Sequence, residues 1–302
     1  MNWFSLAVVV STLATILRVS VPYAAAALGG LWCEKSGIMM IGLEGFLLLG
    51  AFLAASANAS GVPALLALLL ALLGCAGAGA LLAWLVERAR VHAVIVGLAF
   101  NLFVFGFSRA MLRAFFGSTS NSPPLSAFEG FALGGSTFGP LFRFFLAPTS
   151  WIVVALFAST LFVFRRTRLG LSVRAAGENP KAAFVLGVSV LRTRVIACAI
   201  GGGIAGLGGI ALAFDQRQFQ SGMSAGRGFI ALAIVILSGW RIERILPIAL
   251  TFALLDTVQL SLQNVSRGAS QLFQAAPYLV TLLALALVRS RNAAPKGMGV
   301  SA

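Results

Sequence analysis

Residues 62–86 read VPALLALLLALLGCAGAGALLAWLV, a run of 25 residues without a charged side chain. About 20 apolar residues are enough for an α-helix to cross the hydrocarbon core of a bilayer, so this stretch predicts a transmembrane helix. The whole 302-residue chain has the same character, because 59% of its residues are hydrophobic and only 10% are charged. A soluble domain carries about a quarter charged residues. Composition therefore excludes a soluble enzyme, a disordered chain and a disulfide scaffold, and we expect one transmembrane domain over residues 1–302.

Similar apolar runs, separated by polar or basic breaks, recur along the chain. They cover residues 3–31 (interrupted by Arg18 and Pro22), 38–55, 62–86, 93–111, 150–164, 195–214, 225–239, 245–262 and 272–288. The predicted fold is all-α, a polytopic transmembrane helix bundle of nine or ten spans. Nine spans follow if the first run crosses once, and ten follow if it crosses as two pieces.

The charge distribution predicts an orientation. The chain has 22 Lys and Arg residues against 8 Asp and Glu, a balance that in a soluble protein would suggest a nucleic-acid partner. Here we expect a lipid bilayer and no nucleic acid, because cytoplasmic loops of membrane proteins are enriched in Lys and Arg. Placing residues 165–194 in the cytoplasm puts fifteen basic residues on that side and five on the other. Residues 165–194 are then a cytoplasmic loop, and residues 112–148 an extracytoplasmic one.

The sequence contains no recognisable catalytic or metal-binding set. His92 is the single histidine, the three cysteines (Cys33, Cys75 and Cys198) lack metal-ligand spacing, and neither a Walker sequence nor a nucleophile–base pattern occurs. Residues 201–206 match GxGxxG, but they lie inside an apolar run, where a nucleotide-binding loop does not fit. We interpret Gly202 and Gly206 as a GxxxG pair that lets two helices pack closely.

Several polar residues lie within or beside the apolar runs. Charge in the bilayer interior is costly, so such groups usually face a cavity or a partner. They could line a solute pathway or form hydrogen bonds between helices; for Glu44, flanked by Gly42 and Gly45, both interpretations stay open. The candidates for a solute pathway are Glu44, Asn101, Arg227, Asp256, Gln259 and Gln263. Asp256, Gln259 and Gln263 are spaced three and four residues apart, so they lie on one face of a helix.

Residues 179–187 predict a short, complete helix within the basic segment. Asn179 can cap its first turn by accepting an amide hydrogen bond, Pro180 suits the first helical position, and Gly187 can end it in a left-handed conformation. Two turns are too short to span a bilayer or to be stable alone. The helix therefore either docks into a groove of a partner or lies on the lipid surface.

Three blocks of sequence resemble one known family. They read SGIMMIGLEG at residues 36–45, TRLGLSVRAAGENPKAA at 167–183 and GRGFIALA at 226–233. The blocks resemble the membrane subunit, or permease, of ABC importers of the branched-chain amino acid and simple sugar type. The chain is most similar to the nucleoside and simple-sugar uptake permeases. It departs from the family pattern at Met40, where Asn is usual, and at residues 241–243, where a short Asn-Pro turn is usual.

This resemblance implies a function and a set of partners. The chain would be a multi-pass permease of the cytoplasmic (inner) membrane that translocates a nucleoside or simple sugar. It would not be an enzyme and would hold no cofactor, because ATP and magnesium would bind a separate ATP-binding subunit. A second permease chain, related but different, and an extracytoplasmic solute-binding protein would complete the importer. The resemblance also implies that the short helix at residues 179–187 is the coupling helix. Contact with the ATPase would involve Arg174, Gly177, Glu178, Asn179, Pro180, Lys181, Ala182 and Ala183. An ion-coupled secondary transporter, with Glu44 or Asp256 as its ion-linked carboxylate, is the alternative.

Overall fold

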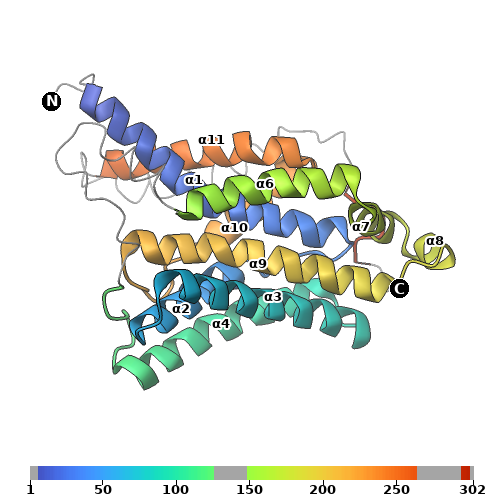
Figure 1. Ribbon diagram of the computed structural model, residues 1–302, viewed down its shortest axis with the longest axis horizontal. Helices are drawn as coiled ribbons and strands as arrows, with labels where there is room; N and C mark the ends of the chain where they lie inside the picture. The colour runs from blue at the N-terminus through green and yellow to red at the C-terminus, as the bar shows by residue number, and fades with distance from the viewer. Residues whose placement is uncertain (1–5, 126–147, 264–293, 300–302) are drawn as a thin grey trace.

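The computed structural model describes residues 6–125, 148–263 and 294–299, and its regular elements within these ranges are all helices. The long helices run side by side, and α7 and α8 lie together at one end of the bundle (Figure 1). The elements are α1 (Leu6–Lys35), α2 (Leu43–Ala59), α3 (Ala64–Arg88), α4 (Ala93–Phe116), α6 (Pro148–Arg166), α7 (Arg168–Glu178), α8 (Pro180–Val185), α9 (Val190–Gln216), α10 (Arg227–Leu237) and α11 (Ile242–Gln263). The prediction of an all-α helix bundle is confirmed.

Among the described residues, five helices are long and apolar enough to cross a membrane, namely α1, α3, α4, α6 and α9. The first of them is continuous through Arg18 and Pro22, as the single-crossing alternative expected. A proline inside a helix removes one backbone hydrogen bond, which transmembrane helices tolerate when neighbours pack around the site. Here Gly208 of α9 lies so close that an added Cβ would be 2.9 Å from the Pro22 carbonyl oxygen. The ten-span count, which needed two pieces in this run, loses its basis.

Two of the predicted spans are shorter as helices than their apolar runs. Residues 38–42 are not helical, and α2 begins at Leu43. α10 has 11 residues, which at 1.5 Å per residue reach about 17 Å, well short of the ~30 Å hydrocarbon core. The expected span over residues 225–239 is therefore corrected. Ala225 and Gly226 have positive φ angles of 47° and 80°, and this turn delays the start of α10.

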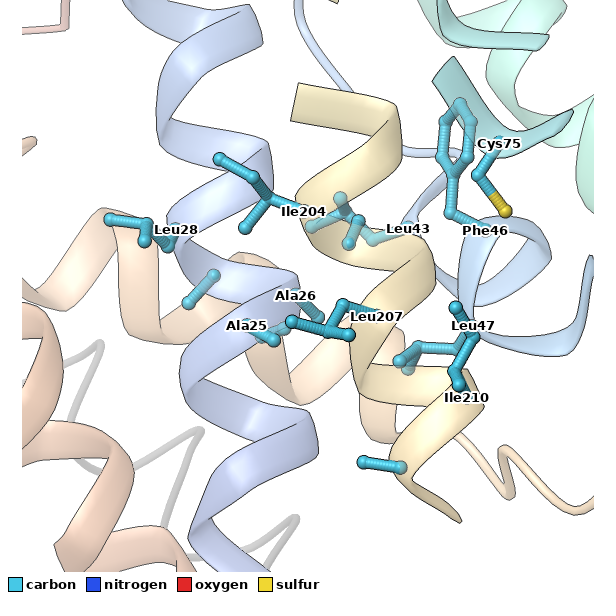
Figure 2. Close-up of a cluster of buried hydrophobic side chains, with 14 of the residues drawn as sticks. Ala25, Ala26, Leu28, Leu43, Phe46, Leu47, Cys75, Ile204, Leu207 and Ile210 are labelled. Carbon is cyan, nitrogen blue, oxygen red and sulfur yellow. The ribbon is translucent and has the colours of Figure 1, made fainter. Parts of the chain in front are cut away.

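The core of the bundle is built around α9, in which every residue from Gly201 to Phe214 is buried. α9 packs against α1, α2 and α3, so it is surrounded by helices, as a helix that is apolar on all sides requires. Figure 2 shows part of this core, with side chains from Ala25, Ala26, Leu28, Leu43, Phe46, Leu47, Cys75, Ile204, Leu207 and Ile210.

Glycines allow α9 and its neighbours to approach closely. A Cβ added at Gly202 would lie 2.7 Å from the Cys75 carbonyl oxygen and 3.1 Å from the Gly79 Cα. A Cβ added at Gly206 would lie 2.7 Å from the Cys75 Cβ. The GxxxG face of α9 is thus in contact with α3, without room for side chains at these positions.

The connecting segments differ from expectation at several boundaries. α4 continues to Phe116 and ends at Gly117, so the expected loop over residues 112–148 begins later. Residues 118–125 lie beside the α9–α10 connection, where Ser122 N donates to Phe219 O at 2.9 Å. The basic stretch at 165–194 is largely helical, because it contains α7, α8 and the first turn of α9. Residues 126–147 and the predicted span over residues 272–288 lie outside the described residues.

Candidate functional site

The first turns of α2 and α10 meet inside the bundle. Glu44 Oε1 accepts a hydrogen bond from Gly226 N at 2.8 Å, and its Oε2 accepts one from Gly228 N at 2.7 Å. A helix N-terminus carries unsatisfied amides and a partial positive charge, and a carboxylate offsets both. An added Cβ at Gly228 would lie 2.7 Å from the Leu43 carbonyl carbon, so the two backbones touch. Glu44 therefore joins two helix ends within the apolar interior.

Asn101 of α4 holds the same junction from another side. Its Oδ1 accepts from Gly45 N at 2.7 Å, and its Nδ2 donates to Ile41 O at 3.0 Å. The ring of Phe46 packs against that of Phe100, with 4.7 Å between centroids. The Asn101 amide thus bonds backbone groups on both sides of the start of α2, the Ile41 carbonyl and the Gly45 amide. Two of the six pathway candidates, Glu44 and Asn101, therefore form hydrogen bonds to the backbone at this junction.

Arg227 and Asp256 form a second polar group next to this junction. Arg227 Nη2 lies 3.6 Å from Asp256 Oδ2, and the two side chains are 19% and 14% exposed. Tyr23 of α1 donates its hydroxyl to the same carboxylate oxygen at 3.2 Å, while Arg227 Nη1 donates to Met223 O at 3.1 Å. Arg227 Nε is buried and has no acceptor among the residues that the structure describes. The group brings together a buried hydroxyl, a guanidinium and a carboxylate from α1, α10 and α11.

The remaining candidates on α11 are placed less fully. Gln259 is half-buried and lies one turn beyond Asp256, on the face that the spacing predicts. Gln263 is the last residue of α11, and its side chain lies outside the described part of the structure. Sequence reasoning missed Tyr23. The available signal was a tyrosine inside an apolar run, since a buried phenol usually finds a hydrogen-bond partner.

A further ion pair lies near this group. Arg18 Nε of α1 is 3.4 Å from Asp215 Oδ1, at the end of α9. The two side chains are 55% and 37% exposed. The pair adds a guanidinium on α1 and a carboxylate on α9, and neither residue was among the predicted pathway candidates.

The predicted short helix forms as α8. Asn179 Oδ1 accepts from Ala182 N at 3.1 Å, Pro180 occupies the first turn, and Gly187 ends the segment with a φ of 83°. The capping predictions are confirmed. The tip of the helix is apolar and exposed: Phe184 is 71%, Val185 is 84% and Leu186 is 82% exposed. α8 thus presents exposed apolar side chains at the end of the bundle, away from the long helices (Figure 1).

The expected coupling residues divide between the two sides of α7 and α8. Gly177, Pro180 and Ala183 are buried, and Ala183 packs with Ala176 and Val190. The exposed members are Arg174, Glu178, Asn179, Lys181 and Ala182. The inner side therefore fixes α8 to the bundle, while the outer side and the tip remain open.

The comparisons with known proteins identify the family. Residues 12–286 match the family described as "Branched-chain amino acid transport system / permease component". The chain belongs to this family. It is 31% identical to the guanosine ABC transporter permease protein NupQ of Bacillus subtilis, with 97% of each chain covered. It is 30% identical to the nucleoside ABC transporter permease protein NupC of Lactococcus lactis, with 95% of each covered. It is 31% identical to the putative glucose ABC transporter permease protein TsgC13 of Haloferax volcanii, over 80% of this chain and 74% of that one.

No solved structure matches the chain. As a member of this family of ABC transporter permeases, it is an integral membrane protein, in agreement with the five apolar helices. The Glu44 junction and α8 both lie within residues 12–286. Each falls in one of the blocks whose resemblance to the permeases is described above.

Proposed function

We propose that this permease is the membrane-spanning part of an ATP-driven importer in the cytoplasmic membrane, and that a separate subunit hydrolyses the ATP. The observation that carries the proposal is the exposed apolar tip of α8, formed by Phe184, Val185 and Leu186. Exposed apolar residues of this size favour a protein partner, and a capped helix fixed on its inner side is preorganised for docking into a groove. ATP and magnesium would bind that partner.

The orientation of α8 supports the same proposal. The end of the bundle that carries α7 and α8 also carries Arg165, Arg166, Arg241 and Arg244. Basic residues accumulate on the cytoplasmic side of membrane proteins, which is where an ATPase subunit works. The opposite end, with residues 112–125, would then face outside and meet a solute-binding protein.

For the solute we propose a nucleoside or a simple sugar. The relatives NupQ, NupC and TsgC13 are named for guanosine, nucleosides and glucose. Such solutes are neutral and rich in hydroxyl groups, which both donate and accept hydrogen bonds. The group of Tyr23, Arg227 and Asp256, with Gln259 one turn further, presents donors and acceptors of matching kinds. We propose that this group lies on the solute pathway of a dimer formed with a related permease chain.

The deciding experiment is uptake by proteoliposomes that contain this permease, its ATPase subunit, its partner permease and its binding protein. ATP is enclosed, and labelled guanosine and labelled glucose are compared. We expect uptake of one of them to need ATP and to persist when an uncoupler collapses the ion gradients. Uptake that an uncoupler abolishes, and that ignores ATP depletion, would instead establish an ion-coupled transporter.

A paired variant tests the role of α8 within that system. Asn179→Ala with Pro180→Gly removes the cap and the rigid first turn, and so loosens the helix. We expect weaker recovery of the ATPase subunit with the permease and slower uptake, while insertion into the membrane is unaffected. ATP-dependent uptake at the original rate would refute the coupling assignment.

A further inference from the structure

Arg194, in the first turn of α9, is buried between four segments that are distant in sequence. Its side chain is 1% exposed and pairs with the carboxylate of Glu87 at the end of α3. Its Nε donates to Ser36 O at 3.0 Å, in the α1–α2 connection. Its Nη2 lies 3.4 Å from both Ala176 O of α7 and Gly297 O of the C-terminal segment. One guanidinium thus ties α3, α7, the α1–α2 connection and residues 294–299 together.

The backbones of these segments also contact one another directly. Gly297 N donates to Gly177 O at 2.8 Å, and Gly299 N donates to Gly37 O at 3.0 Å. Gly37 has a φ of 99°, and an added Cβ would lie 2.7 Å from Arg194 Nη2. An added Cβ at Gly177 would lie 3.2 Å from Gly37 N. The end of α7, the α1–α2 connection and the C-terminal segment therefore interlock around the Arg194 guanidinium.

We propose that Arg194 is a positioning residue that clamps α7 and α8 to the α1–α2 connection, so that these segments move as one body. The proposal rests on the function proposed above, since it concerns how a displacement of α8 reaches the solute pathway. Buried arginines suit such a clamp, because the planar guanidinium offers five donors in a fixed geometry. The bonds to Ser36 and Ala176 join the two segments that must move together.

The contacts continue from the clamp to the Glu44 junction. Ser36 and Gly37 lead into residues 38–42, whose Ile41 carbonyl is held by Asn101. That segment leads into α2, where Glu44 caps the first turn of α10. Arg227 begins α10 and approaches Asp256. A shift of the α1–α2 connection would therefore displace the α10 terminus and Arg227 through this contiguous chain of contacts.

The variant Arg194→Lys removes the hydrogen bonds of the guanidinium while keeping its positive charge. A lysine keeps a positive charge opposite Glu87 but cannot donate to Ser36, Ala176 and Gly297 together. In the reconstituted importer we expect ATP hydrolysis to continue while the solute transported per ATP falls about tenfold, within the usual range of coupling between sites. The complex should still assemble, with a melting temperature lowered by the hydrogen bonds that are lost. Arg192→Lys, an exposed arginine two residues away, is the matched control and should change nothing.

A second variant keeps the test decisive if Arg194→Lys reduces assembly. Gly297→Val displaces the C-terminal segment, because a Cβ there would lie 2.7 Å from Gly177 O and 2.8 Å from Pro180 Cδ. It changes no residue of the long helices, and we expect the same loss of transport per ATP. A wild-type ratio in this assembled variant would overturn the clamp while leaving ATP-driven import intact. Absence of ATP-dependent uptake in the wild-type complex would overturn the proposed function, and the clamp with it.

Discussion

Glu44 Oε2 lies 2.7 Å from the backbone nitrogen of Gly228, so a side chain in the first turn of α2 caps the first turn of α10. Two helix N-termini, each with a partial positive charge, thereby meet within the bundle. The shared carboxylate makes that approach favourable, and the missing side chain of Gly228 makes it sterically feasible. This relationship explains why a carboxylate and two glycine-rich motifs occur in otherwise apolar segments.

Glu44→Gln should destabilise the permease. A glutamine oxygen can accept from one of the two amides, but its NH2 group would face the other N–H, and the negative charge is lost. We expect the free energy of unfolding to fall by about 1–3 kcal/mol, the cost of leaving a buried donor unpaired. The measurement is the melting temperature of the purified permease. Glu178→Gln, on an exposed carboxylate of α7, is the control, and equal melting of the two variants would contradict the capping role.

The contact between α3 and α9 predicts opposite outcomes for two glycines of the same helix. A Cβ added at Gly79 would lie 3.3 Å from the Gly202 Cα and still closer to the Cys198 carbonyl. Gly79→Ala should therefore force the helices apart and cost about 1–3 kcal/mol. Gly77 has open space around it, so Gly77→Ala should be neutral or gain up to ~1 kcal/mol from helix propensity. Thermal unfolding of the two variants tests this, and a Gly79→Ala protein as stable as Gly77→Ala would refute the close contact.

The elements that sequence analysis predicted well are those that depend on nearby residues. Asn179, Pro180 and Gly187 act on their own helix, so α8 and its caps could be derived directly. Apolar run length likewise predicted α3 and α9. The length of α10 could not be derived in this way, because its start depends on Glu44, more than 180 residues earlier in the chain.

The site shows the same division between local and distant determinants. Asp256 and Gln259 could be placed on one face from their spacing. Tyr23 could not be joined to them, because its hydrogen bond to Asp256 spans 233 positions. Arg194 was counted among the cytoplasmic charges, yet it is buried, because Glu87 and three carbonyl groups from other segments surround it. Tertiary partners of this kind leave no pattern in a single sequence.

Tyr23→Phe tests the polar group on the proposed pathway. The change removes the hydroxyl group that donates a hydrogen bond to Asp256 and leaves the aromatic ring in place. Tyr23 is buried, and its bond orients the Asp256 carboxylate; without it we expect the solute concentration for half-maximal uptake to rise. Basal ATP hydrolysis should not change. The control is Thr251→Val, which removes an exposed hydroxyl of α11 bonded within its own helix; a variant of Tyr23 with wild-type uptake would remove this group from the pathway.

Glu87 and Glu243, two of the carboxylates at the α8 end of the bundle, should differ in their importance for stability. Glu87 is 5% exposed and pairs with Arg194, whereas Glu243 is 49% exposed and pairs with Arg165 at 2.5 Å. Breaking a buried pair leaves an uncompensated charge and costs about 3–5 kcal/mol, while water screens the exposed pair to below about 1 kcal/mol. Melting of Glu87→Gln and Glu243→Gln measures the contrast. Similar melting temperatures for the two variants would contradict the burial of Arg194.

The exposed pair should also respond little to pH near neutrality. A hydrogen bond from its own backbone amide, and then one from Arg165, lower the pKa of Glu243. A carboxylate with a lowered folded-state pKa contributes its stability above its unfolded pKa, about 4.3, and loses it as the pH falls through the lower folded value. Wild type and Glu243→Gln should therefore differ by the same small amount between pH 7 and pH 5. A difference that vanishes in that window would show that the Arg165 pair does not form.

Leu186→Asp tests the apolar tip of α8 as the docking surface for the ATPase subunit. Leu186 is 82% exposed and touches little of its own chain, so the substitution should not disturb folding. A charge placed in an apolar groove loses hydration without gaining a partner, and we expect recovery of the ATPase subunit with the tagged permease to fall at least tenfold, with uptake lost in parallel. Leu171→Asp adds the same charge at a 61% exposed leucine of α7 outside the tip and should leave more of the complex intact. Equal recovery with Leu186→Asp and wild type would place the ATPase contact elsewhere.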